Sequence, residues 1–189
     1  MEKTQITVKP FQREHISIIN KTNEPFSIIG RLIPSFNNGK WTYEEELYEH
    51  TSYTKFPDDN LEWDDYINKE NKIIFLAFIG DEYIGQIRLI KDWNKFCYIE
   101  NIAVCKDYRK NGVGKTLFAT AEQWAIQMSL RGISLEAQDD NLLACKFYIK
   151  QGMELGSVDT LKHVFHPNID KTLYWYKVFP EYKVPVINR

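Results

Sequence analysis

A short basic turn with two glycines stands in the middle of this 189-residue chain. Its residues are Arg109, Lys110, Asn111, Gly112, Val113, Gly114 and Lys115. Gly112 and Gly114 have no Cβ atom, so the backbone there can turn tightly and approach a ligand closely. Backbone N–H groups and positive charge at the start of a helix bind anions. The pattern predicts a phosphate-binding turn.

Spacing excludes two well-known phosphate loops. The tripeptide Gly114-Lys115-Thr116 resembles the end of a Walker A loop, but the glycine required five residues earlier is replaced by Arg109. The dinucleotide fingerprint requires a glycine three residues after Gly114, where the chain has Leu117. What remains is an Arg-x-x-Gly-x-Gly pattern, for which a solvated basic loop is the ordinary alternative.

The segments on either side of the turn favour the phosphate site. Residues 97–104 read as a largely buried strand, and apolar residues recur at helical spacing from Leu117 to Met128. Gly132 is expected to end this helix, and residues 133–137 read as a second strand. The two strands of such a unit are expected to be parallel neighbours.

The other segments are expected to form further strands and helices of one domain, residues 1–189. Strands are predicted over 5–11, 72–79, 83–91, 153–157 and 172–179, and a turn at 80–82 makes a hairpin. Helices are predicted over 13–20, from 60 or 61 to 69, and over 142–151, with a helix-turn at 28–36. Thr42 and Glu45 read as a capping box for a helix to His50.

Composition indicates a globular protein of the cytoplasm. The chain is 43% hydrophobic and 14% aromatic, and no apolar run approaches the roughly 18 residues of a membrane helix. The charged start MEKTQITVK is unlike a signal peptide. Cys97, Cys105 and Cys145 are odd in number and form no CxxC, so reduced thiols are expected.

Charge is unevenly distributed, although the net charge is only −2. Residues 41–70 carry a net charge of −8 and the remainder carries +6. Such segregation creates a field that attracts cations. The segment is either a solvated face or an acidic lip for a cationic substrate. The basic excess elsewhere is modest and not interleaved with aromatic residues, which disfavours a nucleic-acid partner.

Other reactive residues give weaker indications. His163 and His166 have the spacing of a metal pair, but no cysteine or carboxylate cluster accompanies them, so an ordinary loop and no metal are expected. Cys105 adjoins the basic turn and is expected to be a small, partly buried thiol. The chain has no Gly-x-Ser-x-Gly motif of a serine hydrolase.

Taken together, these motifs resemble those of the GNAT superfamily of acetyl-CoA-dependent N-acetyltransferases. The strand YIENIAV, the basic turn and a later Asn141-x-x-Ala144-x-x-Phe147-Tyr148-x-x-x-Gly152 carry the resemblance. Segments such as Glu24-Pro25-Phe26, Trp41-Thr42 and residues 156–160 extend it over most of the chain, toward the streptothricin acetyltransferases. That group often has an acid where this chain has Asn101. The implied fold is α/β (α+β), a mixed, mostly antiparallel sheet with helices on both faces.

The resemblance implies a binding mode for acetyl-CoA. The N–H groups and charges of the turn would hold the pyrophosphate. The pantetheine arm would pair with the backbone of the preceding strand, and Asn141 would contact the arm from the other side. The strand residues so implied are Ile102, Ala103 and Val104.

Acetyl transfer to an amine needs a base, an oxyanion donor and an acid for the departing thiolate. The superfamily places a tyrosine near the thioester sulfur, which makes Tyr148 the predicted acid; ordinary core packing is the alternative. Glu100 stands in an apolar strand and is the predicted base or ammonium ligand, unless it is simply exposed to solvent. Strand alternation puts Tyr98, Glu100, Ile102 and Val104 on one face, a parity that a β-bulge would change. The N–H near Val104 is the predicted oxyanion donor.

These predictions converge on transfer of acetyl to a small cationic acceptor, for which the resemblance implies the β-lysine amine of streptothricin and so antibiotic resistance. Asp64, Asp65 and Asp159 are expected to help Glu100 bind it. Two alternatives remain: acetylation of protein lysines or N-termini, and a non-catalytic acetyl-CoA-binding module. Relatives pair through their sheets, so a homodimer is compatible with the resemblance, although no pattern marks an interface.

Overall fold

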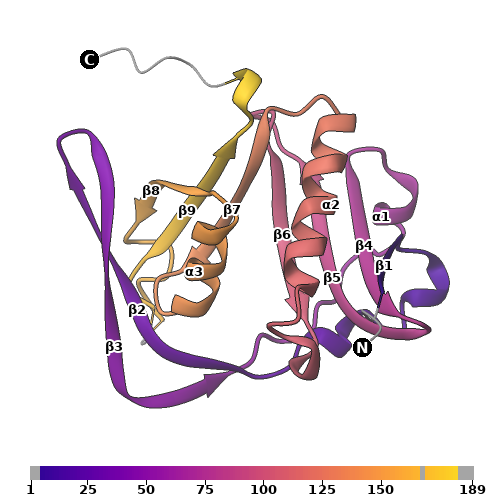
Figure 1. Ribbon diagram of the computed structural model, residues 1–189, viewed down its shortest axis with the longest axis horizontal. Coiled ribbons are helices and arrows are strands. Elements are labelled where there is room, and N and C mark those ends of the chain that lie inside the picture. Colours follow the sequence, from indigo (N-terminus) through magenta and orange to yellow (C-terminus); the bar gives the residue numbers. More distant parts are fainter. Residues whose placement is uncertain (1–4, 167–168, 183–189) are drawn as a thin grey trace.

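A seven-stranded sheet forms the centre of the molecule in the computed structural model, which describes residues 5–166 and 169–182. The strand order is β1-β4-β5-β6-β7-β9-β8, and β2 and β3 form a separate long hairpin (Figure 1). The sheet strands are β1 (Ile6–Pro10), β4 (Lys72–Ile79), β5 (Glu82–Lys91), β6 (Cys97–Val104), β7 (Gly132–Gln138), β8 (Glu154–Asp159) and β9 (Thr172–Val178). The hairpin strands are β2 (Phe26–Asn37) and β3 (Lys40–Thr54).

Helices cover both faces of the sheet. The α-helices are α1 (Asp65–Asn68), α2 (Val113–Gln127) and α3 (Leu142–Lys150), and the 3₁₀ helices are η1 (Arg13–His15), η2 (Ile19–Thr22), η3 (Lys106–Tyr108) and η4 (Pro180–Tyr182). The larger apolar cluster joins one face of the sheet to α2 and α3. A smaller cluster joins the opposite face to the segments around η2 and α1.

The continuous apolar run at residues 72–79 forms β4, which is buried on both faces. Ile74, Leu76 and Phe78 belong to the smaller cluster, whereas Phe75 and Ala77 pack on the α2 side. A strand buried on both faces has no polar alternate positions. The predicted hairpin with β5 and the antiparallel step to β6 are confirmed.

The prediction of helix between residues 28 and 50 is wrong. This region is the β2–β3 hairpin, in which Thr42 pairs with Ser35 instead of capping a helix. Asn38 and Gly39 form the turn with φ of 50° and 74°, the Asn-Gly combination that favours a tight hairpin. That dipeptide was the sequence signal for two strands.

Three further boundaries differ from expectation. The helix expected to reach from residue 60 or 61 to 69 is confined to α1, and residues 13–20 form two short 3₁₀ turns. Helix α2 ends before Ser129, which has φ of 55°, so Gly132 is not its stop. Gly132 instead begins β7, where a Cβ would overlap the backbone oxygen of Lys177 and only glycine fits. Gly152 does follow α3 with φ of 80°, as predicted.

Candidate active site

Strands β6 and β7 pair and then separate, which creates the central feature of the candidate site. They are parallel neighbours, as predicted, but in the described chain their register contains only Cys97 with Ile133 and Tyr98 with Ser134. Beyond these pairs, residues 99–104 continue along β5 while residues 135–138 continue along β9 (Figure 1). We call the gap between these two runs the β6–β7 opening.

Backbone groups of β6 face this opening. The N–H of Cys105 donates to the carbonyl of Ile84 at 2.9 Å. Because hydrogen-bonded and non-hydrogen-bonded residues alternate in an antiparallel pair, Ala103 bonds to β5 whereas Ile102 and Val104 direct their N–H and C=O groups away from it. These groups are where an extended ligand would add as a strand.

The basic turn follows β6 after the short helix η3 and is fixed by Arg109. Its Nε donates to the Val104 carbonyl at 3.0 Å, and its Nη1 donates to the Pro25 carbonyl at 2.9 Å. The Lys106 N–H donates to Glu24 Oε2 at 2.5 Å. Glu24 and Pro25, part of the resemblance noted above, thus support the turn from the segment before β2.

Gly112 ends the turn in the left-handed region with φ of 86° and serves as the N-cap of α2. The first intrahelical bond runs from the Thr116 N–H to the Gly112 carbonyl at 3.0 Å. The N–H groups of Val113, Gly114 and Lys115 therefore have no partner within the helix, which is the arrangement that binds anions. Exposed Lys110, Asn111 and Lys115 surround them.

Helix α3 approaches the same turn. A Cβ at Gly114 would lie 3.3 Å from the Phe147 ring, so this glycine allows α2 and α3 to come close together. Asn141 is the N-cap of α3, where its Oδ1 accepts the Ala144 N–H at 3.3 Å. Asn141 also forms a parallel bridge with Gly30 of β2, which ties the hairpin to α3.

Tyr148 lies inside the α2 side of the core. Its side chain is 8% exposed and its ring packs against Phe147 at 5.6 Å between centroids. Burial, with a smaller effect of the Cys145 thiol, raises the pKa of Tyr148 beyond its usual range. The phenol is therefore neutral at physiological pH, the protonation state that a general acid needs.

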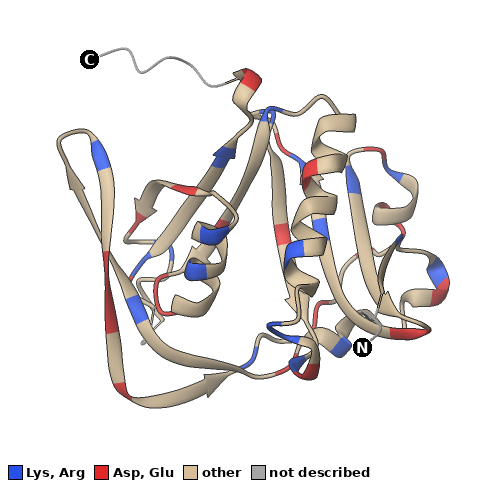
Figure 2. Ribbon diagram, viewed as in Figure 1, with Lys and Arg blue, Asp and Glu red and all other residues tan. Residues whose placement is uncertain are grey.

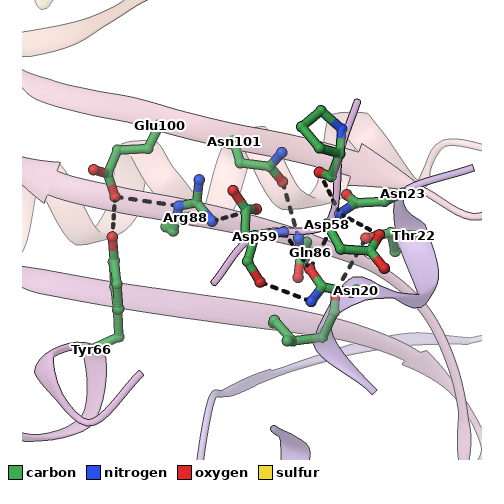
Figure 3. A network of polar contacts seen from close by, with 12 residues as sticks. Asn20, Thr22, Asn23, Asp58, Asp59, Tyr66, Gln86, Arg88, Glu100 and Asn101 are labelled. Carbon is green, nitrogen blue, oxygen red and sulfur yellow. Dashed lines mark hydrogen bonds and ion pairs between the residues drawn. The ribbon is translucent and has the colours of Figure 1, made fainter. Parts of the chain in front are cut away.

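Glu100 is placed by a β-bulge. The register of β5 and β6 shifts between Arg88 and Leu89, which leaves Glu100 as the extra residue. The bulge changes the parity of the strand: Ile102 and Val104 pack on the α2 side, whereas Glu100 contacts groups on the opposite face. Glu100 Oε2 accepts the Tyr66 hydroxyl at 2.5 Å and lies 3.4 Å from Arg88 Nε (Figure 3).

Arg88 joins Glu100 to a wider polar network that the sequence reasoning missed. Its Nη1 donates to Asp59 Oδ2 at 2.9 Å, and Asn20 fixes the Asp59 backbone through two hydrogen bonds (Figure 3). Beside it, Gln86 donates to Asn101 at 3.1 Å. Gln86 and Arg88 stand two apart within an otherwise apolar strand, and that alternation was the available signal.

The acidic segment 41–70 does not form one lip. Its β3 part lies beside β8, whereas α1 packs on β4 near the other end of the sheet (Figures 1 and 2). Asp64 pairs with Arg13 at 2.9 Å, and Asp65 pairs with Lys69 at 2.8 Å, which lowers the pKa of Asp65. Asp59 is the member that reaches the Glu100 network.

Asp159 ends β8 and organises the loop that follows. Its Oδ1 accepts the backbone N–H groups of Leu161 and Lys162 at 2.8 and 3.0 Å, and these bonds lower its pKa. In the described ranges, no group of three or more His, Cys, Asp or Glu residues has an arrangement suited to a metal ion.

This arrangement, in which a parallel strand pair separates and helix α2 follows β6, agrees with a family match. The model described as the acetyltransferase (GNAT) family matches residues 33–153. The chain belongs to this family. The expected GNAT fold is confirmed, and the protein is an acetyl-CoA-dependent N-acetyltransferase.

Two sequence relatives align with this acetyltransferase, one over nearly the whole chain and one over more than half of it. Streptothricin acetyltransferase A of Bacillus subtilis (strain 168) is 39% identical over 180 residues, which are 95% of this chain and 99% of that protein. A streptothricin acetyltransferase of Escherichia coli is 36% identical over 118 residues, 59% of this chain and 68% of that one.

Solved structures agree with these sequence relatives. A candidate streptothricin acetyltransferase of Bacillus anthracis str. Ames, in complex with acetyl coenzyme A, has a TM-score of 0.85 at 35% identity over 93% of this chain and 100% of that chain. A nourseothricin acetyltransferase has a TM-score of 0.77 at 20% identity, over 93% and 99% of the two chains, and supports the fold alone.

Among the helices of the described residues, none combines the length and the hydropathy that a membrane crossing requires.

Proposed function

We propose that this acetyltransferase transfers acetyl from acetyl-CoA to an amino group of streptothricin, a small polycationic acceptor. The observation that carries the proposal is the position of Glu100, a carboxylate at the β6–β7 opening on the face opposite α2 and α3. The thioester would reach the opening from the helix side and the ammonium from the carboxylate side. The names of the relatives that align over most of the chain support streptothricin as the acceptor.

Acetyl-CoA would bind along the elements that the sequence indicated. The turn from Arg109 to Lys115 would hold its pyrophosphate, chiefly through the N–H groups at the start of α2. Its pantetheine arm would pair with the outward N–H and C=O groups of Ile102 and with the Val104 carbonyl, which can accept a second hydrogen bond beside that from Arg109. Asn141 would contact the arm through Nδ2. Arg109 would act mainly by fixing the turn, because its Nε and Nη1 donate to backbone carbonyls.

The reaction forms an N–C bond and breaks the C–S bond of the thioester. The acceptor must first lose a proton, because an ammonium with a pKa near 10.4 is not a nucleophile. The N–H of Val104 would stabilise the oxyanion, and Tyr148 would give its proton to the departing thiolate. The amine's proton leaves toward Glu100, directly or through water.

The contacts of Glu100 define its role more narrowly. Oε2 already accepts the Tyr66 hydroxyl and forms an ion pair with Arg88, so Oε1 is the atom available to the acceptor. An ammonium can donate to this oxygen in a charge-assisted hydrogen bond, which orients the acceptor. We therefore favour orientation of the ammonium as the role of Glu100, with its proton leaving through water.

The deciding experiment measures thiol release from acetyl-CoA with streptothricin, spermidine, aminoglycosides and basic peptides as acceptors. Streptothricin is expected to give the highest kcat/KM. A higher value with basic peptides would assign the protein to protein acetylation. Tight acetyl-CoA binding without release by any acceptor would indicate a non-catalytic binding module.

The proposed setting is the cytoplasm, with a small-molecule acceptor and without a membrane or nucleic-acid partner. Cys97, Cys105 and Cys145 are free thiols, which suits a reducing compartment. Burial raises the pKa of Cys97 and Cys145, so neither is a reactive thiolate.

A further inference from the structure

A second carboxylate flanks the β6–β7 opening opposite Glu100. Tyr98 and Ser134 are the last paired residues, and Glu100 and Glu136 each follow two positions later on the diverging strands. Leu135, the neighbour of Glu136, packs on the α2 side, so Glu136 lies on the other face, as Glu100 does. The two carboxylates thus stand on the same face, one on each side of the opening.

This second carboxylate already binds an ammonium group of the protein itself, that of Lys162. Lys162 Nζ forms an ion pair with Glu136 Oε2 and lies over the ring of Tyr174, 5.7 Å from its centroid. Tyr174 pairs with Glu136 across β7 and β9, so carboxylate and ring are adjacent. The pKa of Tyr98 is raised, first by burial and then by Glu136, which places this third side chain beside the carboxylate.

The position and exposure of Lys162 suit a side chain that another cation can displace. Lys162 belongs to the loop between β8 and β9, and Asp159 fixes its backbone N–H. Its side chain is 38% exposed and that of Glu136 is 30% exposed, so the pair borders solvent. An ion pair at this degree of exposure contributes little stability and exchanges readily for another cation.

We propose that Glu136 and the Tyr174 ring bind a second ammonium group of the acceptor, and that Lys162 occupies this subsite until the acceptor displaces it. The inference rests on the proposed function, since it requires an acceptor with more than one positive charge. A carboxylate beside an aromatic face is the standard environment for an ammonium. Lys162 would balance the charge of Glu136 while the site is empty, and would act as an internal competitor of the acceptor.

The test measures the dissociation constant of streptothricin by calorimetry, with coenzyme A present, in variants of the pair. Lys162→Met keeps the aliphatic stem and removes the competitor, so the dissociation constant should fall about two- to fivefold, the range expected for an exposed ion pair. Glu136→Gln should raise it about fivefold or more. In the double variant the effect of Lys162→Met should disappear, because the competitor acts only at Glu136.

Lys146→Met is the matched control. Lys146 forms an ion pair of similar exposure with Glu45, at 2.7 Å, between α3 and β3 and away from the opening. Its loss should leave streptothricin binding unchanged. A dissociation constant that is unchanged or raised in Lys162→Met overturns the inference, as does an effect that persists in the double variant or the absence of streptothricin binding.

Because binding is the readout, the two proposals can fail separately. Streptothricin that binds and responds to Lys162→Met but receives no acetyl group would contradict the proposed function alone. Acetyl transfer without any response to Lys162→Met would contradict the subsite alone.

Discussion

At the scale of residues, the two candidate catalytic groups, Tyr148 and Glu100, lie in opposite kinds of surroundings. Tyr148 is buried among apolar side chains, which keeps its phenol protonated. Glu100 lies in a bulge and forms an ion pair with Arg88. The phenol of Tyr148 is thereby suited to give a proton, and the carboxylate of Glu100 is suited to attract a cation.

Replacing Tyr148 by phenylalanine tests the acid. The ring and its packing against Phe147 are retained, and only the hydroxyl is removed. We expect kcat to fall about 100-fold, the lower end of the effect of a general acid, with an unchanged dissociation constant for acetyl-CoA. Steady-state kinetics and calorimetry give both values. Tyr53→Phe, at a 70% exposed tyrosine of β3, is the control and should match the wild type.

The pH dependence gives a second readout of the same variant. Because burial raises the pKa of Tyr148, the phenol is protonated below that pKa and does not limit the rate at mildly alkaline pH. The value of kcat/KM should therefore rise with pH as the acceptor amine loses its proton. Tyr148→Phe should lower this profile without changing its shape. A profile that declines between pH 8 and 10 only in the wild type would contradict the assignment.

At the scale of elements, the unit from β6 to α3 could be predicted because its local signals agree. A buried strand, Gly112, the helical stripe of α2, the Asn141 cap and Gly152 all indicate the same arrangement. The β2–β3 hairpin could not be predicted by the same reasoning. Thr42 and Glu45 have the spacing of a capping box by coincidence, and the acidic residues of this exposed strand are also typical of a helix. The Asn38-Gly39 turn is the signal that indicates a hairpin.

The candidate site was predictable only where it depends on local sequence. Gly112 and Asn141 act through the backbone next to them, and their placement followed from spacing. The Glu100 network joins η2, the segment around Asp59, β5 and β6, so its partners Tyr66 and Arg88 depend on tertiary packing. The bulge that orients Glu100 also depends on pairing with β5.

Gly112→Asp tests the turn as an anion site. A side chain there meets no atom within 4 Å, but it would stand with a negative charge among the N–H groups at the start of α2. We expect the dissociation constant of acetyl-CoA to rise about tenfold or more, measured by calorimetry.

Gly39→Asp is the matched control for this substitution. Gly39 also has a left-handed φ, 74°, and open space around it, but lies in the β2–β3 turn. Both variants should lose about 1 kcal/mol of stability in denaturant unfolding, from the strained backbone. Equal acetyl-CoA binding by the two variants would contradict the phosphate-binding role of the Gly112 turn.

At the scale of the whole molecule, the position of the acidic residues matters more for attracting the acceptor than their number does. The segment 41–70 holds most of the acidic excess, yet its β3 residues lie on the separate hairpin (Figure 2), and Asp64 and Asp65 pair with nearby cations. Asp59 and Glu100 share the single cation of Arg88, so this network retains one negative charge beside the opening. The field that an acceptor meets is therefore set by a few carboxylates of the sheet face.

This reasoning predicts different results for two neutral substitutions in the acidic segment. Asp59→Asn leaves Arg88 to neutralise Glu100, so the KM of the acceptor should rise about three- to tenfold while the KM of acetyl-CoA is unchanged. Glu49→Gln removes the same charge from an exposed position of β3 and should change neither value. Thermal unfolding of Asp59→Asn shows whether the variant still folds, so that the effect of the lost charge can be distinguished from loss of structure. An equal rise in both variants would show that net charge, and not the Arg88 network, attracts the acceptor.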